Sequence, residues 1–239
     1  MKAMVLCAGY GTRLGHLVEQ VPKPMLPLGG RPMLEYILRH LARHGFDQIV
    51  VNLHFRPDVI RDYFGDGSQL GIRLTYSHEP ELLGTAGGIK KMADFLGGPE
   101  PFLVHYGDVI TDQDFAAMLH FHSQQRALAT LLVHQRDHSN SVIGLDEEQR
   151  IVGFLERPSE AQRQTLISRW VNSGVAICDC QLLDAIPTSE VCDLPRDIYS
   201  KLIGSRRLFA FPLTGYRCAV DSPERLQEAA AAVARGIFN

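Results

Sequence analysis

The sequence predicts an α/β fold in which a Rossmann-like, doubly wound mixed sheet is the middle of three α/β/α layers. In the front half, apolar runs alternate with segments of helical periodicity, which is typical of βαβ units around a parallel sheet. In the back half the strand-like segments are shorter and follow one another directly, which predicts a mixed-sheet extension. The predicted strands cover residues 4–8, 49–53, 102–105, 128–133, 142–145, 151–155, 171–177 and 207–213, and the predicted helices cover residues 32–44, 57–64, 86–96, 113–125, 194–203 and 222–234.

Length and composition indicate a single globular domain. The chain has 239 residues, of which 45% are hydrophobic and 21% charged, and no segment is poor enough in apolar residues to predict disorder. We therefore expect one domain over residues 1–239, with a front half of about residues 1–135 and an extension of about residues 136–239.

Charge and hydropathy exclude several partners. The net charge is −3 and the basic residues are dispersed, whereas binding to a nucleic-acid duplex requires a concentrated positive face. No apolar run approaches the roughly 20 residues that span a bilayer, and no signal-type segment precedes the first strand. The five cysteines are scattered and odd in number, which is typical of reduced thiols. These features predict a cytoplasmic protein with a small substrate and no membrane or nucleic-acid partner.

The first predicted strand leads into a glycine turn that carries basic residues. Gly9 and Gly11 let the main chain turn sharply and leave backbone N–H groups uncovered, and such a nest of amides accepts phosphate oxygens. Arg13 adds a planar fork of donors, and Lys23 lies between two prolines and adds a compact charge. Two cations near a glycine loop suit a triphosphate.

Other interpretations of this loop are weaker. A dinucleotide-binding fingerprint requires glycine where Leu14 stands, which also argues against a dinucleotide-dependent oxidoreductase, and no Walker-type G-K-[ST] follows any glycine loop. A purely structural turn is the remaining alternative for a lone Gly-x-Gly.

Two further segments are candidates for a ligand site. Asp108 follows a buried apolar run, and a carboxylate at the end of such a strand points into the crevice where open sheets bind ligands, although helix capping or a turn is the alternative. Residues 83–88, LGTAGG, place a flexible turn before a helix, so its backbone amides could face an anion or a base.

The first thirty residues resemble the sugar-1-phosphate nucleotidyltransferases, also called nucleotide-sugar pyrophosphorylases. The signature of that family is approximately G-x-G-T-R-[LM]-x-P-L-T followed, about seven residues later, by P-K-P-[ML]-[LV]-P. The matching residues, at the same spacing, are Gly9, Gly11, Thr12, Arg13, Leu14, Pro22, Lys23, Pro24, Met25, Leu26 and Pro27. Three positions depart from it, namely Gly15, His16 and Val18. The chain is similar to short members without an appended β-helix, and the resemblance extends to about residue 226.

The resemblance implies a fold of the nucleotide-diphospho-sugar transferase type and a reaction. An NTP and a sugar 1-phosphate would give an NDP-sugar and pyrophosphate, with Arg13, Lys23 and Asp108 as catalytic residues. It also implies that the front half binds the nucleotide. The implied nucleotide contacts are Leu6, Ala8, Gly9, Gly11, Thr12, Arg13, Glu79, Gly84, Thr85, Ala86 and Gly87.

The resemblance further implies a sugar site in the extension and a metal site. The implied sugar-phosphate contacts are Gly107, Glu156, Arg157, Asn172 and Gly174. Asp108 and Asp221 are the implied Mg²⁺ ligands, and two carboxylates with phosphate oxygens and water suit Mg²⁺. Arg157 replaces the family's usual lysine, and Ser141 stands where many relatives have glycine, so the identity of the sugar stays open.

Within this family the LGTAGG turn favours guanine, because many thymidylyl enzymes have a different sequence there. We therefore expect GTP with mannose 1-phosphate or a manno-heptose 1-phosphate. The alternatives are a uridylyl- or thymidylyltransferase acting on another sugar 1-phosphate, of the glucose or N-acetylmuramate type, and a non-catalytic regulator that binds nucleotide-sugars. The presence of Arg13, Lys23, Asp108 and Asp221 favours an enzyme over the regulator. A homodimer is expected by analogy with relatives.

Overall fold

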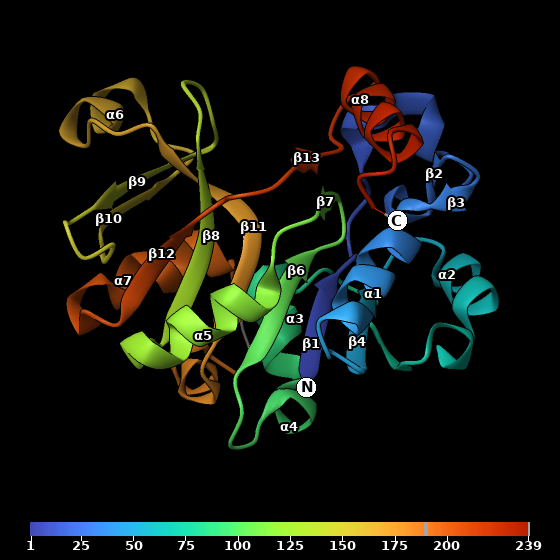
Figure 1. Ribbon diagram of the computed structural model, residues 1–239, viewed down its shortest axis with the longest axis horizontal. Coiled ribbons are helices and arrows are strands. Elements are labelled where there is room, and N and C mark those ends of the chain that lie inside the picture. The colour runs from blue at the N-terminus through green and yellow to red at the C-terminus, as the bar shows by residue number, and fades with distance from the viewer. Residues whose placement is uncertain (189–190, 239) are drawn as a thin grey trace. The chain divides into compact units, whose positions relative to one another are not determined.

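A computed structural model describes residues 1–188 and 191–238, and describes Thr12 and Arg13 by their backbone alone. The chain divides into two compact units (Figure 1). The first unit comprises Met1–Leu82, His105–Asp114 and Thr214–Asn239, and the second comprises Leu83–Val104 and Phe115–Leu213.

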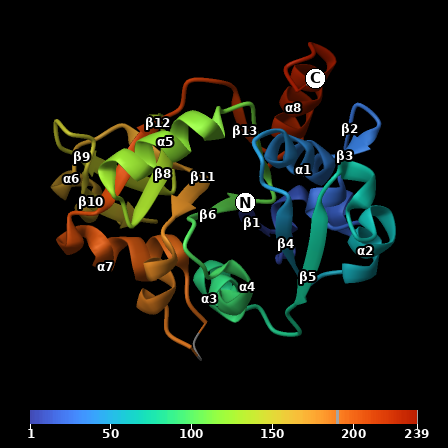
Figure 2. The same ribbon diagram turned by 60° about the horizontal axis from the view of Figure 1, so that its bottom comes forward.

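The first unit is built on parallel strands. Its strands are β1 (Lys2–Leu6), β2 (Pro27–Leu28), β3 (Arg31–Pro32), β4 (Gln48–Leu53), β5 (Arg73–His78), β7 (Val109–Thr111) and β13 (Arg217–Ala219), and its helices are α1 (Met33–Arg43), α2 (Pro57–Phe64) and α8 (Pro223–Ala234). β1 pairs with β4 and β4 with β5, all in parallel, with Lys2 opposite Gln48 and Gln48 opposite Arg73. Figure 2 shows β4 and β5 running side by side. The loops that follow these strands therefore emerge at one edge, where open α/β sheets bind ligands.

Helix α1 packs into the core of the first unit through one apolar face. Its apolar residues recur at helical spacing, so Met33, Ile37 and Leu41 are buried while Arg39 lies on the exposed side. Helix α8 begins at Ser222, whose side chain accepts a hydrogen bond from the backbone N–H of Arg225, and Pro223 occupies its first position. Both ends of the sequence thus contribute helices to the same unit.

The second unit contains a mixed set of strands. Its strands are β8 (Ala129–Gln135), β9 (Ser141–Leu145), β10 (Ile151–Glu156), β11 (Trp170–Cys178) and β12 (Leu208–Pro212), its helices are α3 (Gly84–Lys91), α4 (Ala93–Leu96), α5 (Phe115–Gln125), α6 (Glu160–Thr165) and α7 (Ser200–Leu202), and β6 (Phe102–Tyr106) contributes residues to both units. β11 is antiparallel to β8 and β9 to β10, whereas β12 runs parallel to β8. The predicted mixed α/β fold is confirmed.

Several predicted elements differ in detail. The predicted helix over residues 86–96 is two helices, because the backbone leaves helical geometry at Met92. The predicted helix over 194–203 is a π-helical turn, Leu194–Tyr199, followed by α7 and a 3₁₀ turn. Strand β5 was not predicted, because it is only partly buried and carries polar residues such as Arg73 and Thr75.

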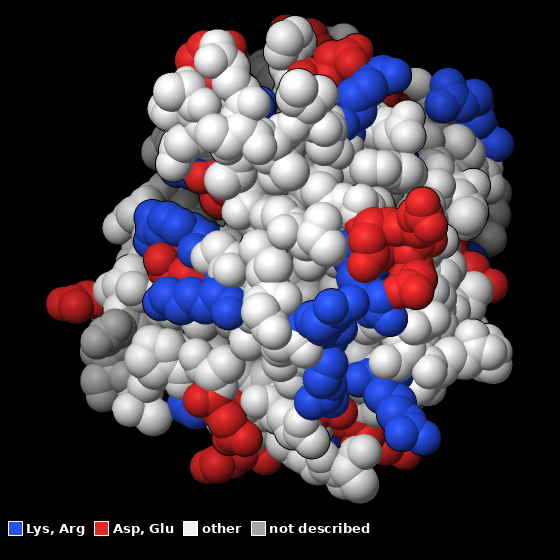
Figure 3. All heavy atoms as spheres, turned by 90° about the vertical axis from the view of Figure 1, so that its left-hand side faces the viewer, with Lys and Arg blue, Asp and Glu red and all other residues white. Residues whose placement is uncertain are grey.

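On the face shown in Figure 3, basic and acidic side chains are interspersed among uncharged residues.

Among the described residues, every helix is too short or too polar to cross a bilayer.

The buried side chain of Asn52 joins three neighbouring segments of the first unit. Its Oδ1 accepts hydrogen bonds from the backbone N–H of Cys7 at 2.7 Å and of Ala8 at 3.3 Å. Its Nδ2 donates to Oε1 of Glu79 at 2.8 Å. Asn52 lies opposite Leu6 of β1 and Ser77 of β5, so one amide satisfies the backbone just beyond β1 and the carboxylate just beyond β5.

Replacing Asn52 with alanine is expected to destabilise the fold strongly. The substitution leaves the buried N–H of Cys7, the partly buried N–H of Ala8 and the Glu79 carboxylate without this partner, which costs roughly 2–4 kcal/mol of unfolding free energy. Urea denaturation at neutral pH measures the loss.

Ser77→Ala is the matched control, because Ser77 is the buried neighbour of Asn52 and its Oγ has no hydrogen-bond partner in the described part of the chain. We expect Ser77→Ala to change the unfolding free energy by less than about 0.5 kcal/mol. Equal losses in the two variants would show that the amide network does not stabilise the unit.

Candidate functional site

The glycine loop of the first unit requires glycine for two separate reasons. Gly11 has φ 63°, in the left-handed region, and a Cβ there would lie 3.0 Å from Cβ of Lys23. Gly15, within the 3₁₀ turn Thr12–Val18, has φ 54° and ψ −129°. The departure from the family pattern at Gly15 therefore has a backbone cause. Leu14 and Val18 pack with Leu26 in a small buried cluster, so the departure at Val18 supplies core packing.

The predicted phosphate ligand Arg13 lies in this turn, but its side chain and that of Thr12 are outside the described residues. Leu6 ends β1, and Ala8 donates its N–H to Asn52 as described above. The roles assigned to Leu6, Ala8, Gly9, Thr12 and Arg13 therefore stay predictions.

Lys23 and Asp108, which come from two separate motifs, form an ion pair. Lys23 Nζ lies 2.6 Å from Oδ2 of Asp108, and the two side chains are 14% and 35% exposed. They are 85 residues apart in the sequence. The structure thus brings a predicted phosphate-binding cation onto a predicted metal-binding carboxylate within the first unit.

The loop that carries Asp108 is held tightly. Gly107 donates its N–H to the carbonyl of Leu6 at 2.9 Å, and a Cβ on Gly107 would lie 2.5 Å from Sγ of Cys7. On the other side, the N–H of Val220 donates to the carbonyl of Asp108 at 2.8 Å, and Ala219 pairs with Val109. Asp221 therefore follows a segment that is hydrogen-bonded to the backbone of Asp108. Gly107 is needed here for close packing against the end of β1, a reason that differs from its predicted sugar contact.

The predicted metal ligands have the donor chemistry that a Mg²⁺ ion completed by substrate would require. Asp108 and Asp221 would supply hard carboxylate oxygens, and no group of three or more His, Cys, Asp or Glu side chains that could hold a metal occurs among the described residues. Mg²⁺ is usually held in this way, by one or two carboxylates together with phosphate oxygens and water. Asp108 also carries a cation, Lys23, that a bound ion would have to share or displace.

Glu79 is buried and its carboxylate is held by Asn52. The backbone N–H of Glu79 also donates a hydrogen bond to the carbonyl of Leu53 at 2.8 Å, so the main-chain pairing of β4 with β5 extends to Glu79. Sequence reasoning did not single out Asn52. The available signal was a polar residue inside the apolar run of residues 49–53, which in a buried strand requires hydrogen-bond partners.

The LGTAGG turn of the second unit is closed by the segment around Cys192. The backbone N–H groups of Ala86 and Gly87 both donate to the carbonyl of Cys192, at 2.9 and 3.1 Å. Thr85 Oγ1 donates to Asp193 at 3.2 Å and accepts from the N–H of Leu194 at 2.7 Å. Gly84 has φ 75°.

The expectation that these helix-start amides face an anion or a base is therefore wrong for Ala86 and Gly87, because a protein carbonyl occupies them. A nucleotide contact of residues 84–87 would have to use other atoms. The assignment of these residues to the nucleotide stays a prediction.

The predicted sugar residues of the second unit lie at the end of β10 and on β11, the two strands on either side of β9. Glu156 on β10 pairs with Ser141 on β9, and the Oγ of Ser141 accepts a hydrogen bond from the N–H of Asn172 on β11 at 2.9 Å. Asn172 Oδ1 in turn accepts from the N–H of Gly174 at 3.2 Å, where φ is 82°. Ser141, which stands in place of the usual glycine, thus stabilises the backbone position of Asn172 through this hydrogen bond. Sequence reasoning noted Ser141 only as a departure.

Arg157 follows β10 in a left-handed conformation with φ 48° and is 75% exposed. Its Nε lies 3.9 Å from Oε1 of Glu156. Burial, and to a smaller extent the Asp193 carboxylate, raise the pKa of Glu156 to about 7 against the opposing effect of Arg157 and Arg196. Asp193 therefore links the predicted sugar carboxylate electrostatically to the LGTAGG turn, and sequence reasoning missed it because nothing in its local pattern marks it.

Curated relatives cover most of this chain. A UTP--glucose-1-phosphate uridylyltransferase from Synechocystis sp. is 34% identical over 221 residues, covering 86% of this chain and 56% of the relative. A mannose-1-phosphate guanylyltransferase from Mycobacterium tuberculosis is 33% identical over 239 residues, covering 98% of this chain and 65% of the relative. The chain thus spans between 56% and 65% of the length of these two relatives.

Solved structures share the fold over nearly the whole chain. A Bacillus anthracis protein assigned as a glucose-1-phosphate thymidylyltransferase, solved with sucrose, superposes with a TM-score of 0.87 at 22% identity, covering 100% of this chain and 99% of that one. HddC from Yersinia pseudotuberculosis superposes with a TM-score of 0.81 at 21% identity, covering 97% and 99%. The family model described as "Nucleotidyl transferase" matches residues 2–215, and the chain, with its glycine loop and its Lys23–Asp108 pair, belongs to this nucleotidyl transferase family.

Proposed function

We propose that this protein transfers a nucleoside monophosphate from an NTP to a sugar 1-phosphate, giving an NDP-sugar and pyrophosphate. The observation that carries the proposal is the 2.6 Å contact between Lys23 Nζ and Asp108 Oδ2, with Lys23 packed beside Gly11 of the glycine loop. A cation and a carboxylate at this position are what a phosphate chain with its Mg²⁺ requires. Family membership supports the same reaction class.

In the proposed reaction an oxygen of the sugar phosphate attacks the α-phosphorus of the NTP in line. The new bond joins that oxygen to the α-phosphorus, and the bond to the bridging α–β oxygen breaks, so pyrophosphate leaves with the electron pair. Little covalent chemistry falls to the protein, and its contribution is positioning and charge neutralisation. Arg13 would stabilise the transferring and leaving phosphates, and Lys23 would hold the α-phosphate and the sugar phosphate. Asp108 and Asp221 would hold Mg²⁺, which when bound neutralises phosphate charge.

We propose GTP with mannose 1-phosphate or a manno-heptose 1-phosphate as substrates. Relatives named as mannose-1-phosphate guanylyltransferases, from Mycobacterium tuberculosis, Oryza sativa and Dictyostelium discoideum, support guanine. The uridylyltransferase relative at 34% identity keeps UTP with glucose 1-phosphate as the alternative. Pyrophosphate release measured for GTP, UTP, dTTP, CTP and ATP against several sugar 1-phosphates separates these pairs. Nucleotide-sugar binding without release from any pair would favour a regulator over an enzyme.

Arg13→Ala is expected to bind NTP but to lose turnover by a factor on the order of 10²–10³, because a preorganised donor to the developing phosphate charge is removed. Pyrophosphate release and equilibrium binding of NTP measure the two effects. Arg61→Ala in α2 is the control, since Arg61 lies in a partly exposed ion pair with the neighbouring Asp58, outside the predicted site. Normal release by Arg13→Ala would remove Arg13 from the mechanism.

Asp108→Asn is expected to lower activity and to raise the Mg²⁺ concentration that half-saturates the reaction, because a neutral amide binds the ion less well than a carboxylate. The measurement is a Mg²⁺ titration of initial rates. Asp62→Asn, on the exposed side of α2, removes the same charge elsewhere in the first unit. Retained activity with an unchanged Mg²⁺ dependence in Asp108→Asn would refute the metal assignment.

Glu156 is expected to make the second unit sensitive to pH between about 4.5 and 7, because its pKa is raised from 4.5 to about 7. In that window the folded state binds the proton more tightly than the unfolded state, so the contribution of Glu156 to the unfolding free energy falls as pH rises. Once ionised, the carboxylate accepts hydrogen bonds from sugar hydroxyls more strongly, so kcat/KM for the sugar 1-phosphate should rise from pH 6 to pH 8.

Glu156→Gln should remove both pH effects, whereas Glu160→Gln, on the exposed side of α6, should keep them. Chemical denaturation at pH 5 and pH 8 and initial rates over the same range provide the comparison. Parallel profiles for the wild type and Glu156→Gln would contradict a raised pKa at Glu156.

A further inference from the structure

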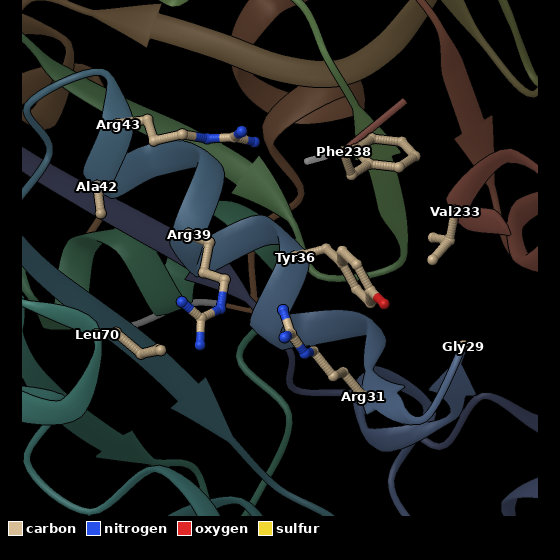
Figure 4. Close-up of a pocket in the computed structure, with 9 residues that line it drawn as sticks. All are labelled: Gly29, Arg31, Tyr36, Arg39, Ala42, Arg43, Leu70, Val233 and Phe238. Carbon is tan, nitrogen blue, oxygen red and sulfur yellow. The ribbon is translucent and has the colours of Figure 1, made fainter. Parts of the chain in front are cut away.

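The first unit contains a pocket of about 530 Å³ apart from the glycine loop (Figure 4). We call it the arginine pocket. Its lining residues are Gly29, Arg31, Tyr36, Arg39, Ala42, Arg43, Leu70, Val233 and Phe238. The volume is within the range of roughly 300–1,000 Å³ that is typical of small-molecule sites.

The arginine pocket extends along α1 toward the other end of the parallel strands. Arg43 is the last residue of α1, and the chain then enters β4, whose first residue Gln48 pairs with Lys2 at the start of β1. The glycine loop follows Leu6 at the opposite end of β1, roughly 13 Å further along at the usual rise of a strand. The Arg43 end of the pocket therefore lies away from the residues proposed to transfer the nucleotide.

The lining carries three guanidinium groups and, among the described residues, no acidic side chain. The carboxylate that contacts two of them is Glu35, which is 7% exposed and lies behind the lining, 2.8 Å from Nε of Arg39 and 3.7 Å from Nε of Arg31. Glu35 also accepts a hydrogen bond from the hydroxyl of Tyr63 at 2.9 Å. The buried carboxylate of Glu35 thus accepts a hydrogen bond from Nε of Arg39 and lies within ion-pair distance of Nε of Arg31.

An apolar wall faces these cations. The rings of Tyr36 and Phe238 meet edge to face with centroids 6.1 Å apart, and Tyr36 is anchored by a hydrogen bond from its hydroxyl to the carbonyl of Leu28 at 2.8 Å. Val233 and Leu70 are the other large apolar residues of the lining. In the view of Figure 4 the side chains of Arg31, Arg39 and Arg43 lie between Leu70 on one side and Phe238 and Val233 on the other.

We propose that the arginine pocket binds a phosphorylated small molecule that carries a ring. Its phosphate meets the guanidinium groups, whose planar forks match phosphate oxygens, and its ring lies against Tyr36 and Phe238. Arginines on an exposed helix face are ordinarily only solvated, but here they line a cavity together with two aromatic rings, and the buried carboxylate of Glu35 is hydrogen-bonded to Arg39. Two classes of molecule have this chemistry, nucleoside phosphates and phosphorylated sugars.

The test is calorimetric titration of the full chain with GDP, with glucose 6-phosphate and with inorganic pyrophosphate. The pocket variant is the double substitution Arg31→Gln and Arg43→Gln, which leaves Arg39 in place because it is the closest partner of buried Glu35. The matched control is Arg61→Gln with Arg73→Gln, which removes the same charge from the first unit at residues outside the pocket. Thermal unfolding of both variants verifies that they are folded.

The wild type and the control are expected to bind at least one of the two ring-bearing probes at a site that the pocket variant has lost or binds on the order of tenfold more weakly. The probe that loses this site identifies the class of ligand. Identical isotherms for the wild type and the pocket variant, or an equal loss in the control, would overturn the proposal. Pyrophosphate that binds at this site as tightly as both ring-bearing probes would overturn the role of the aromatic wall. The readout is binding, so it is independent of the proposed transfer reaction.

Discussion

The buried amide of Asn52 is the constraint on which the ligand-facing edge of the first unit depends. Parallel strands β1, β4 and β5 end at that edge, and the backbone just beyond β1 and the Glu79 carboxylate just beyond β5 both need partners. One side chain satisfies them, because an amide carries an acceptor and a donor on a single planar group. The backbone of Cys7 and Ala8, from which the glycine loop starts, is therefore held in place by hydrogen bonds to Asn52.

From that point the charged groups of the first unit are brought together by backbone contacts. Gly107 packs against the end of β1 without room for a side chain, and the N–H of Val220 holds the carbonyl of Asp108. Lys23 then reaches Asp108, so a cation and a carboxylate share a partly buried position. Such a pair is costly to desolvate, and in the proposed reaction phosphate and a divalent ion would redistribute its charges.

The second unit accounts for residues that depart from the family pattern. Ser141 uses its hydroxyl to hold the backbone of Asn172, so the departure supports the predicted sugar site. The turn at residues 84–87 is completed by Cys192 and Asp193, and Asp193 also raises the pKa of Glu156. A substitution in the turn at residues 84–87 that moves Asp193 would therefore change the pKa of Glu156, the predicted sugar-binding carboxylate.

The sequence by itself determined the mixed α/β class, most strands and helices, and the family, because these depend on local periodicity and on the spacing of residues within one segment. The residues from Gly9 to Pro27 were sufficient to predict the family. The left-handed backbone conformation of Gly11 explains why glycine occupies that position. Only the tertiary structure decided the partners: Lys23 with Asp108, Asn52 with Cys7 and Glu79, Cys192 on the amides of Ala86 and Gly87, and the arginine pocket beside Phe238. These contacts join residues far apart in the chain, and they arise from chain packing, which no local pattern encodes.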